Sequence, residues 1–229
     1  SVFATARRRD IVIAASVQPG FSRPRGWRSV LTTTLAAAAV AFAQPALADC
    51  GDAIDGERVP CRCGDVIVAD TRLQPDDPVV TDACEADGLL VRAPAQSRSI
   101  VVDLNGQEIR GSGVGIGVYV LHGGSDGAVI VGGVAGLSGV VSGFREGVRS
   151  MRPDALRSLA NVVVRESRGA GIVVRGNGTS IESVRLESNG EDGIRASGRS
   201  VDLVDVESEG NGRSGVRDHA RGGQRDVAS

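Results

Sequence analysis

Five charged residues toward the C-terminal end recur at spacings that could build a binding surface on stacked strands: Arg165, Arg185, Glu187, Asp205 and Glu207. In the alignment of the repeats that we prefer, Arg165, Glu187 and Glu207 form one outward column. Val163, Arg185 and Asp205 form the neighbouring column. Stacked carboxylates can hold Ca²⁺, which prefers oxygen ligands, or can bind a polysaccharide. The alternative is a solvated face on which Arg185 and Asp205 offset each other, because exposed charge pairs are common and contribute little.

Other side-chain chemistry is sparsely represented. The chain contains no Lys, which excludes a Schiff base and a lysine general base. His122 and His219 lie far from the four cysteines, whose spacing does not fit a zinc site. The pair Asp218-His219 is more typical of a turn than of a catalytic dyad. We therefore assign no catalytic residue, leave open whether the chain is an enzyme, and expect no metal or cofactor, with Ca²⁺ the one ion left open.

A repeat positions these charged residues. The dipeptides Gly171-Ile172, Gly193-Ile194 and Gly215-Val216 follow one another at a constant interval. A fixed period of about 22 residues is typical of a solenoid, in which each repeat leaves an apolar face that only its neighbours can cover. Between these dipeptides, apolar β-branched residues alternate with charged ones, which indicates strands rather than helices.

Two alignments of the repeats are open. Matching the Glu-Ser pairs that begin at 166, 187 and 207 gives unequal spacings, and it points Arg165 into the stack. Matching apolar residues keeps every inward position apolar and moves the length variation into the turn before the third Gly. We prefer the second alignment, which pairs these residues in order: Val162 and Val164, Val184 and Leu186, Val204 and Val206.

Sharp corners are indicated by four Asn-Gly pairs, at residues 105, 177, 189 and 211, because Asn and Gly tolerate a left-handed backbone. Short strands that are joined by such corners and return once per repeat predict a parallel β-helix. Residues 100–218 would supply about five to six rungs at that period. Residues 151–159, with Pro153 near their start, break the rhythm and are expected to form a loop.

These features resemble the right-handed parallel β-helix repeat proteins of the pectin-lyase-like superfamily. The resemblance rests on the three Gly-Ile/Val units, on Val102-Asp103-Leu104-Asn105-Gly106 and on the segment 142–148, and it spans roughly residues 63–218. It implies an all-β fold, but the fold hosts lyases, hydrolases, epimerases and non-catalytic surface proteins. The catalytic Arg-x-Pro-x-x-Arg segment of pectate lyases is not matched, because Arg152-Pro153 lacks the intervening residue.

Residues 1–48 read as a signal peptide and an upstream segment. Three arginines precede an apolar run at residues 30–43, and Ala46-Leu47-Ala48 is a small-x-small cleavage site. The run is shorter than a transmembrane span requires. Without this segment, which holds six Arg and one Asp, the formal charge changes from −2 to −7. We therefore expect a secreted, periplasmic or extracellular protein with no membrane partner after signal removal and no nucleic-acid partner.

Cys50, Cys61, Cys63 and Cys84 form an even set that indicates disulfides in an exported protein. Of the three pairings, we favour Cys50 with Cys61 and Cys63 with Cys84. They would staple residues 49–99 as an N-terminal cap with strands at 66–68 and 89–91, because the first rung of a solenoid exposes an apolar end. Residues 219–229 are polar and rich in Gly, and they are expected to be a disordered tail.

Together these expectations describe a monomer that binds an extracellular polysaccharide or cell-surface glycan without established catalysis. Aromatic stacking on a sugar is not expected, because only Tyr119 and Phe144 remain after signal removal. The alternative is a lyase, hydrolase or epimerase of the same superfamily, with or without Ca²⁺, or a truncated piece of one.

Overall fold

Strands account for 51% and helices for 2% of the chain in the computed structural model. The structure describes residues 49–50, 53–54, 57–94, 96–134, 136–220 and 225–228, all of which belong to one unit that spans residues 43–229. The expected signal peptide lies outside these described residues. Within them, none of the helices has the length and apolar character needed to cross a membrane.

One parallel sheet has eight strands, here called sheet A. Successive members of the sheet are separated in sequence by one or two other strands, so the chain leaves the sheet and returns to it at every step. Its strands, in spatial order, are β1 (Asp49–Cys50), β4 (Asp65–Ile67), β7 (Leu89–Arg92), β10 (Ile116–His122), β13 (Glu146–Ser150), β16 (Ile172–Gly176), β18 (Ile194–Gly198) and β20 (Val216–Ala220).

A second parallel sheet has eleven strands and is folded into two faces, which meet where the long strands β17 (Thr179–Glu187) and β19 (Val201–Glu209) bend. The first half of β17 continues the face formed by β5 (Thr71–Arg72), β8 (Val101–Asp103), β11 (Ala128–Val131) and β14 (Leu156–Ala160). Its second half continues the face formed by β6 (Ala83–Cys84), β9 (Glu108–Gly111), β12 (Gly139–Ser142) and β15 (Val162–Arg165). We call these the first and second faces.

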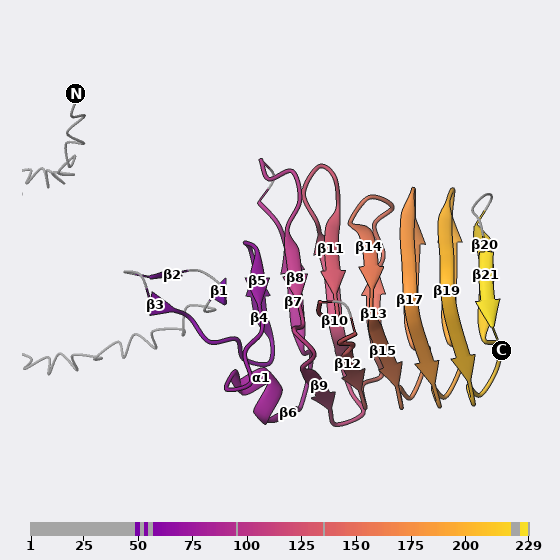
Figure 1. Ribbon diagram of the computed structural model, residues 1–229, viewed down its shortest axis with the longest axis horizontal. Helices are drawn as coiled ribbons and strands as arrows, with labels where there is room; N and C mark the ends of the chain where they lie inside the picture. The colour runs from indigo at the N-terminus through magenta and orange to yellow at the C-terminus, as the bar shows by residue number, and fades with distance from the viewer. Residues whose placement is uncertain are drawn as a thin grey trace, which may run out of the picture. The chain divides into compact units, whose positions relative to one another are not determined.

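Each rung, meaning one circuit of the chain, passes through sheet A, the first face and the second face in turn. Figure 1 shows the resulting strands side by side in chain order, from β4 and β5 to β20 and β21. This stacking of parallel strands is compatible with a β-helix. Only the hairpin of β2 (Ala53–Ile54) and β3 (Glu57–Arg58) is antiparallel among the described strands.

Two left-handed corners recur at the period of the repeat in the C-terminal rungs. In one rung Ser183 and Ser188 have φ values of 50° and 53°, and in the next Asp205 and Gly210 have 52° and 64°. Each pair brackets the four strand residues of the second face. Such φ values are uncommon outside Gly, Asn and Asp, so Asp205 and Gly210 suit these corners, whereas Ser183 and Ser188 are held in this conformation by the stacked rungs.

The repeated Gly before Ile or Val has a packing cause. A Cβ atom at Gly171 would lie 2.8 Å from the carbonyl oxygen of Gly193 in the next rung. Real Cβ atoms do not approach a carbonyl oxygen that closely, so a larger residue would push the rungs apart. The dipeptide that identified the repeat thus marks a place where two rungs come into close contact.

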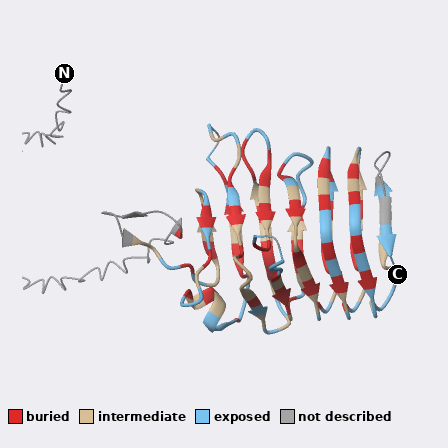
Figure 2. Cartoon of the chain, viewed as in Figure 1, coloured by how far each residue is buried: buried red, intermediate tan, exposed pale blue. Residues whose placement is uncertain are grey.

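The core lies between the three faces and is filled by aliphatic side chains. Ile172 and Ile194 from sheet A, Ile181 from the first face and Leu186 from the second are all 0% exposed. Figure 2 shows the buried positions recurring as bands on successive strands. Alternating residues point inward, as the sequence pattern predicted for strands.

The preferred alignment of the third repeat was wrong. The structure pairs Val184 with Val206 and Leu186 with Ser208, so the interval of the Gly dipeptides is kept throughout the second face. Val204, which we expected to point inward, is 40% exposed. The inward position is taken instead by Ser208, which is 8% exposed and accepts a hydrogen bond of 2.8 Å from the Asn211 side chain.

Two stacked asparagines fix the second corner. The side-chain amide of Asn189, 1% exposed, donates to the carbonyl oxygen of Val164 at 3.1 Å and to Oδ1 of Asn211 at 2.9 Å. Its own oxygen accepts the backbone N–H of Ser167 at 3.1 Å. Asn211 repeats the pattern, donating to the carbonyl oxygen of Leu186 at 3.1 Å. These bonds satisfy backbone groups that the corner would otherwise bury without partners.

The loop expected at 151–159 is shorter than predicted. Residues 156–160 form strand β14, in which Leu156 and Leu159 are 2% and 0% exposed, and only residues 151–155 leave the sheets. Pro153 misled the prediction because it interrupts the alternation just before an otherwise regular buried strand.

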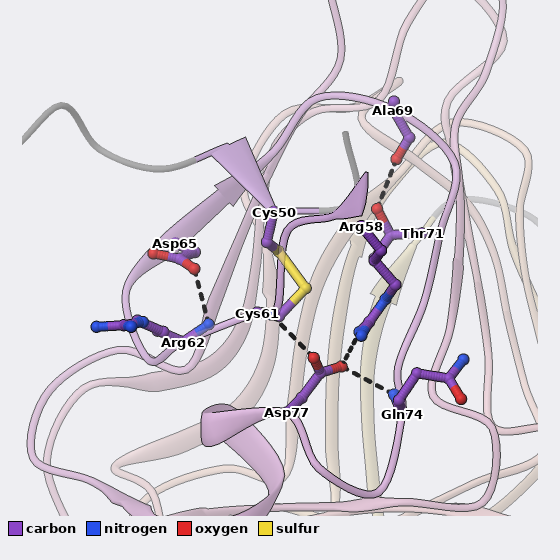
Figure 3. The surroundings of a disulfide bond; sticks show 9 residues. All are labelled: Cys50, Arg58, Cys61, Arg62, Asp65, Ala69, Thr71, Gln74 and Asp77. Atoms are coloured by element: carbon purple, nitrogen blue, oxygen red, sulfur yellow. Dashed lines mark hydrogen bonds and ion pairs between the residues drawn. A yellow bond between two sulfur atoms is a disulfide. The ribbon is translucent and has the colours of Figure 1, made fainter. Parts of the chain in front are cut away.

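The N-terminal disulfides pair as predicted, Cys50 with Cys61 and Cys63 with Cys84. Figure 3 shows the first disulfide beside Asp77, whose buried carboxylate accepts the backbone N–H groups of Cys61 at 3.0 Å and Gln74 at 2.8 Å and pairs with Arg58. Asp77 immediately precedes the short helix α1 (Pro78–Thr81). These contacts hold the disulfide-bonded segment against the first strands.

The strands expected at 66–68 and 89–91 are present at 65–67 and 89–92, and both belong to sheet A. Sheet A continues past residue 100, where we expected the cap to end and the β-helix to begin, because β7 pairs directly with β10. At the other end, where we expected a disordered tail over residues 219–229, the described residues 219–220 and 225–228 lie in strands. Strand β20 extends to Ala220, and β21 (Arg225–Ala228) pairs with β19, placing Val227 opposite Val206.

Candidate functional site

A groove of about 270 Å³ lies on the outer surface, along the corner between the first and second faces. It crosses three successive rungs, with residues from the start of β15, from β17 and from β19, and it is bordered by the loop before β12. The lining residues are Gly136, Leu137, Ser138, Asn161, Val162, Val163, Ser183, Val184, Arg185, Asp205 and Glu207. Adjacent rungs rise by about 4.8 Å, so the groove is elongated along the stack.

The centre of the groove is a column of three polar corner residues, Asn161, Ser183 and Asp205. They recur at the period of the repeat and all have a left-handed backbone, with φ values of 57°, 50° and 52°. The Ser183 hydroxyl donates a hydrogen bond of 2.9 Å to Oδ2 of Asp205. The left-handed corner therefore places an amide, a hydroxyl and a carboxylate side by side on the surface.

An ion pair forms the polar wall of the groove. Nε of Arg185 lies 2.8 Å from a carboxylate oxygen of Glu207 and 3.7 Å from one of Glu187. We expected Arg185 to stack on Asp205 and Glu187 on Glu207, but the corrected register pairs Arg185 with Glu207 and Glu187 with Glu209. The expected columns were wrong for this reason, although the five residues do lie on neighbouring rungs.

Three of the five predicted residues line the groove: Arg185, Asp205 and Glu207. Arg165 and Glu187 belong to the adjacent outward column of the second face and do not line it. Arg165 is engaged elsewhere, because it donates to Glu108 at 3.0 Å across two rungs.

Glu108 is a member of this charged surface that the sequence did not point to. Its carboxylate also accepts a hydrogen bond of 2.8 Å from Ser142. Partial burial acts to raise the pKa of Glu108, but the hydrogen bonds from Ser142 and Arg165 and the charges of Arg165 and Arg110 outweigh it. The pKa of Glu108 therefore lies below its ordinary value, as expected for a carboxylate held in an ion pair.

Part of the groove lining is apolar. Leu137, in the loop between β11 and β12, is 49% exposed, and Val163 of β15, next to Arg185 on the neighbouring strand, contributes further apolar surface. An apolar side chain facing hydrogen-bonding groups is the usual composition of a ligand site, in which polar groups orient the ligand.

Another cluster of charged residues lies beside sheet A, and its carboxylates are already paired with arginines of the same cluster. The Asp192 carboxylate, 0% exposed, pairs with Arg195 at 3.1 Å and with Arg217 at 3.3 Å. Glu191 pairs with Arg195 at 2.7 Å, and the pKa of Arg195 is raised by its hydrogen bonds to Glu191 and Asp192. Because its acidic and basic side chains neutralise one another, we interpret this cluster as ion pairs that stabilise neighbouring rungs rather than as a ligand site.

Two hollows of about 250 and 200 Å³ occupy the opposite corner, between sheet A and the first face, and Asp154 lines both. His122 lines the larger one, where its Nδ1 accepts the backbone N–H of Gly124 at 3.2 Å. No predicted site residue lies in either hollow. Within the part of the chain that the structure describes, no three His, Cys, Asp or Glu residues are grouped so that they could hold a metal ion.

Sequence reasoning missed Asn161, Ser183 and the 136–138 loop. A signal for the first two was present, because Asn161, Ser183 and Asp205 follow the period of the repeat, but their differing chemistry hid it. The arrangement can bind a ligand through hydrogen bonds and apolar contact along three rungs.

In comparisons with known proteins, no family model matches the chain, and no curated protein or solved structure matches it.

Proposed function

We propose that this chain is a secreted, monomeric β-helix protein that binds an extracellular polysaccharide in the groove between the first and second faces. In this proposal the coil is right-handed, as in the pectin-lyase-like proteins that the repeats resemble. The observation that carries the proposal is the groove itself, which extends along the stack and offers an amide, a hydroxyl, carboxylates and a guanidinium beside Leu137.

A polymer suits this geometry better than a small ligand. Solenoids present extended surfaces because each rung repeats the one before, and a chain of sugars repeats along its own axis. The rise of about 4.8 Å per rung is comparable to the length of one sugar residue, so successive corner residues can meet successive sugars. Sugar hydroxyls require the donors and acceptors that Asn161, Ser183 and Asp205 supply.

Export is supported by the two disulfides, because disulfides persist in oxidising compartments outside the cytosol. The formal charge of −2 gives no support to a nucleic-acid partner, since phosphate binding requires a basic surface. The predicted signal peptide points in the same direction, although it lies outside the described residues.

The test is retention of the full purified chain on insoluble neutral, acidic and amino-sugar polysaccharides, measured by co-sedimentation. We expect retention on at least one of them. The variants Arg185→Gln and Leu137→Ser should weaken it about three- to tenfold, as the loss of one charged hydrogen bond or one apolar contact does. Arg175→Gln is the matched control, because Arg175 is exposed on β16 and does not line the groove.

The same samples distinguish binding from catalysis. A lyase, hydrolase or epimerase would shorten or chemically alter the polysaccharide, and neutralising Asp205 or Glu207 would abolish that change. Retention without alteration supports the binding protein. Retention on none of the glycans, or equal retention by the groove variants and the Arg175→Gln control, would refute the groove as the site.

A further inference from the structure

The groove has an unbalanced charge. Arg185 is already paired with Glu207, whereas among the described residues no arginine lies within ion-pair distance of Asp205. Asp205 is exposed, and its Oδ2 is oriented by the Ser183 hydroxyl at 2.9 Å. The groove thus presents one oriented carboxylate whose charge is not neutralised by the protein.

The surrounding surface has the same sign. Strands β17 and β19, which supply the middle and the C-terminal end of the groove, together carry six acidic residues and one arginine. Charges within about 8 Å interact at physiological ionic strength, so several of these carboxylates act on any ligand in the groove. A polyanionic glycan would be repelled there, and a cationic one would be attracted.

We propose that the groove selects glycans that carry free amines, such as glucosamine polymers, over their N-acetylated forms and over polyuronates. The inference rests on the proposed function and names the ligand class of the same groove. A protonated sugar amine beside Asp205 would make a charge-assisted hydrogen bond, while the neighbouring hydroxyls would meet Asn161 and Ser183. An acetylated amine would lose the charge and keep the hydroxyl contacts.

The experiment compares three oligosaccharides of matched length, a glucosamine oligomer, its N-acetylated counterpart and a galacturonate oligomer, by calorimetric titration of the full chain. Mildly acidic buffer keeps the sugar amines protonated, and a chelator removes any contribution from divalent cations. We expect the glucosamine oligomer to bind about two- to fivefold more tightly than the acetylated one, because one exposed charged contact has that effect. The galacturonate should bind most weakly, and added NaCl should reduce only the preference for the amine.

Two variants assign the effect to one carboxylate. Asp205→Asn removes the charge and keeps a residue that tolerates the left-handed φ of 52°, so the corner should fold normally. It should lower the amine-to-acetyl affinity ratio substantially, leaving only the weaker attraction of the more distant carboxylates. Glu209→Gln removes the same charge from the same strand outside the groove lining and should lower the ratio much less than Asp205→Asn does.

Two results would overturn the inference while the proposed function stands: the acetylated oligomer binding as tightly as the amine, or Asp205→Asn leaving the ratio unchanged. If none of the three oligosaccharides binds and the broader polysaccharide panel is also not retained, the proposed function fails and the inference fails with it.

Discussion

Replacing Asn189 by Ala should destabilise the fold far more than replacing the exposed Asn177, which also precedes a Gly at a corner. The Asn189 side chain is 1% exposed and makes three hydrogen bonds, to the Val164 carbonyl, to the Ser167 N–H and to the Asn211 side chain. A net contribution of about 1 kcal/mol per bond gives roughly 3 kcal/mol. The two backbone groups would also lose their partners in a buried corner, which acts in the same direction.

Asn177→Ala is the matched control. Asn177 also precedes a Gly at a corner, but it is exposed and makes one hydrogen bond, to Asp154 at 2.9 Å. We expect its loss to change the free energy of unfolding by less than about 0.5 kcal/mol, as surface substitutions do. Urea unfolding followed by circular dichroism measures both variants. If Asn189→Ala and Asn177→Ala have the same midpoint and slope, the stacked asparagines do not stabilise the coil.

Three further changes test the rest of the structure. Replacing Cys63 and Cys84 together by Ser should lower the free energy of unfolding by roughly 3 kcal/mol, because the disulfide joins residues at a sequence separation of 21. Thermal unfolding without reductant measures this loss of stability, and an unchanged melting temperature would contradict the prediction. Gly171→Ala should lower the melting temperature, because the new Cβ would meet the Gly193 carbonyl oxygen. We expect the free energy of unfolding to fall by about 1–3 kcal/mol. A variant as stable as the parent would show that the rungs can separate. Glu108→Gln should cost up to about 1 kcal/mol at neutral pH. Because the pKa of folded Glu108 is lowered, that contribution is present above the unfolded value near 4.5 and is lost as the pH falls through the folded value, so the two unfolding curves should converge in acid.

The sequence predicted the stacked parallel strands because a constant period and an alternation of apolar residues survive over several rungs. It also predicted both disulfides, since Cys61 and Cys63 are too close in sequence to pair comfortably with each other. It did not reveal that residues 49–99 already enter the same sheets. Strands such as β5 and β6 have two residues each, which is too short to display any period.

The candidate groove was only partly predictable for a related reason. Charged residues stand out in a strand, so Arg185, Asp205 and Glu207 were found from their types alone. Asn161 and Ser183 contribute through their place at a corner, and their chemistry differs from that of Asp205. Leu137 comes from a loop between β11 and β12, and no repeat signal connects it with residues two rungs away.

The error in the third repeat shows which rule governs the register. Keeping every inward position apolar would have placed Leu203 at the left-handed corner, where a bulky apolar residue is a genuine outlier. The actual register places Asp205 there, which tolerates that backbone, and buries Leu203 opposite Ile181. The accompanying burial of Ser208 is offset by its hydrogen bond from Asn211. Corner geometry therefore outweighs the apolar pattern, because a polar inward side chain can find a partner whereas a strained corner has no such remedy.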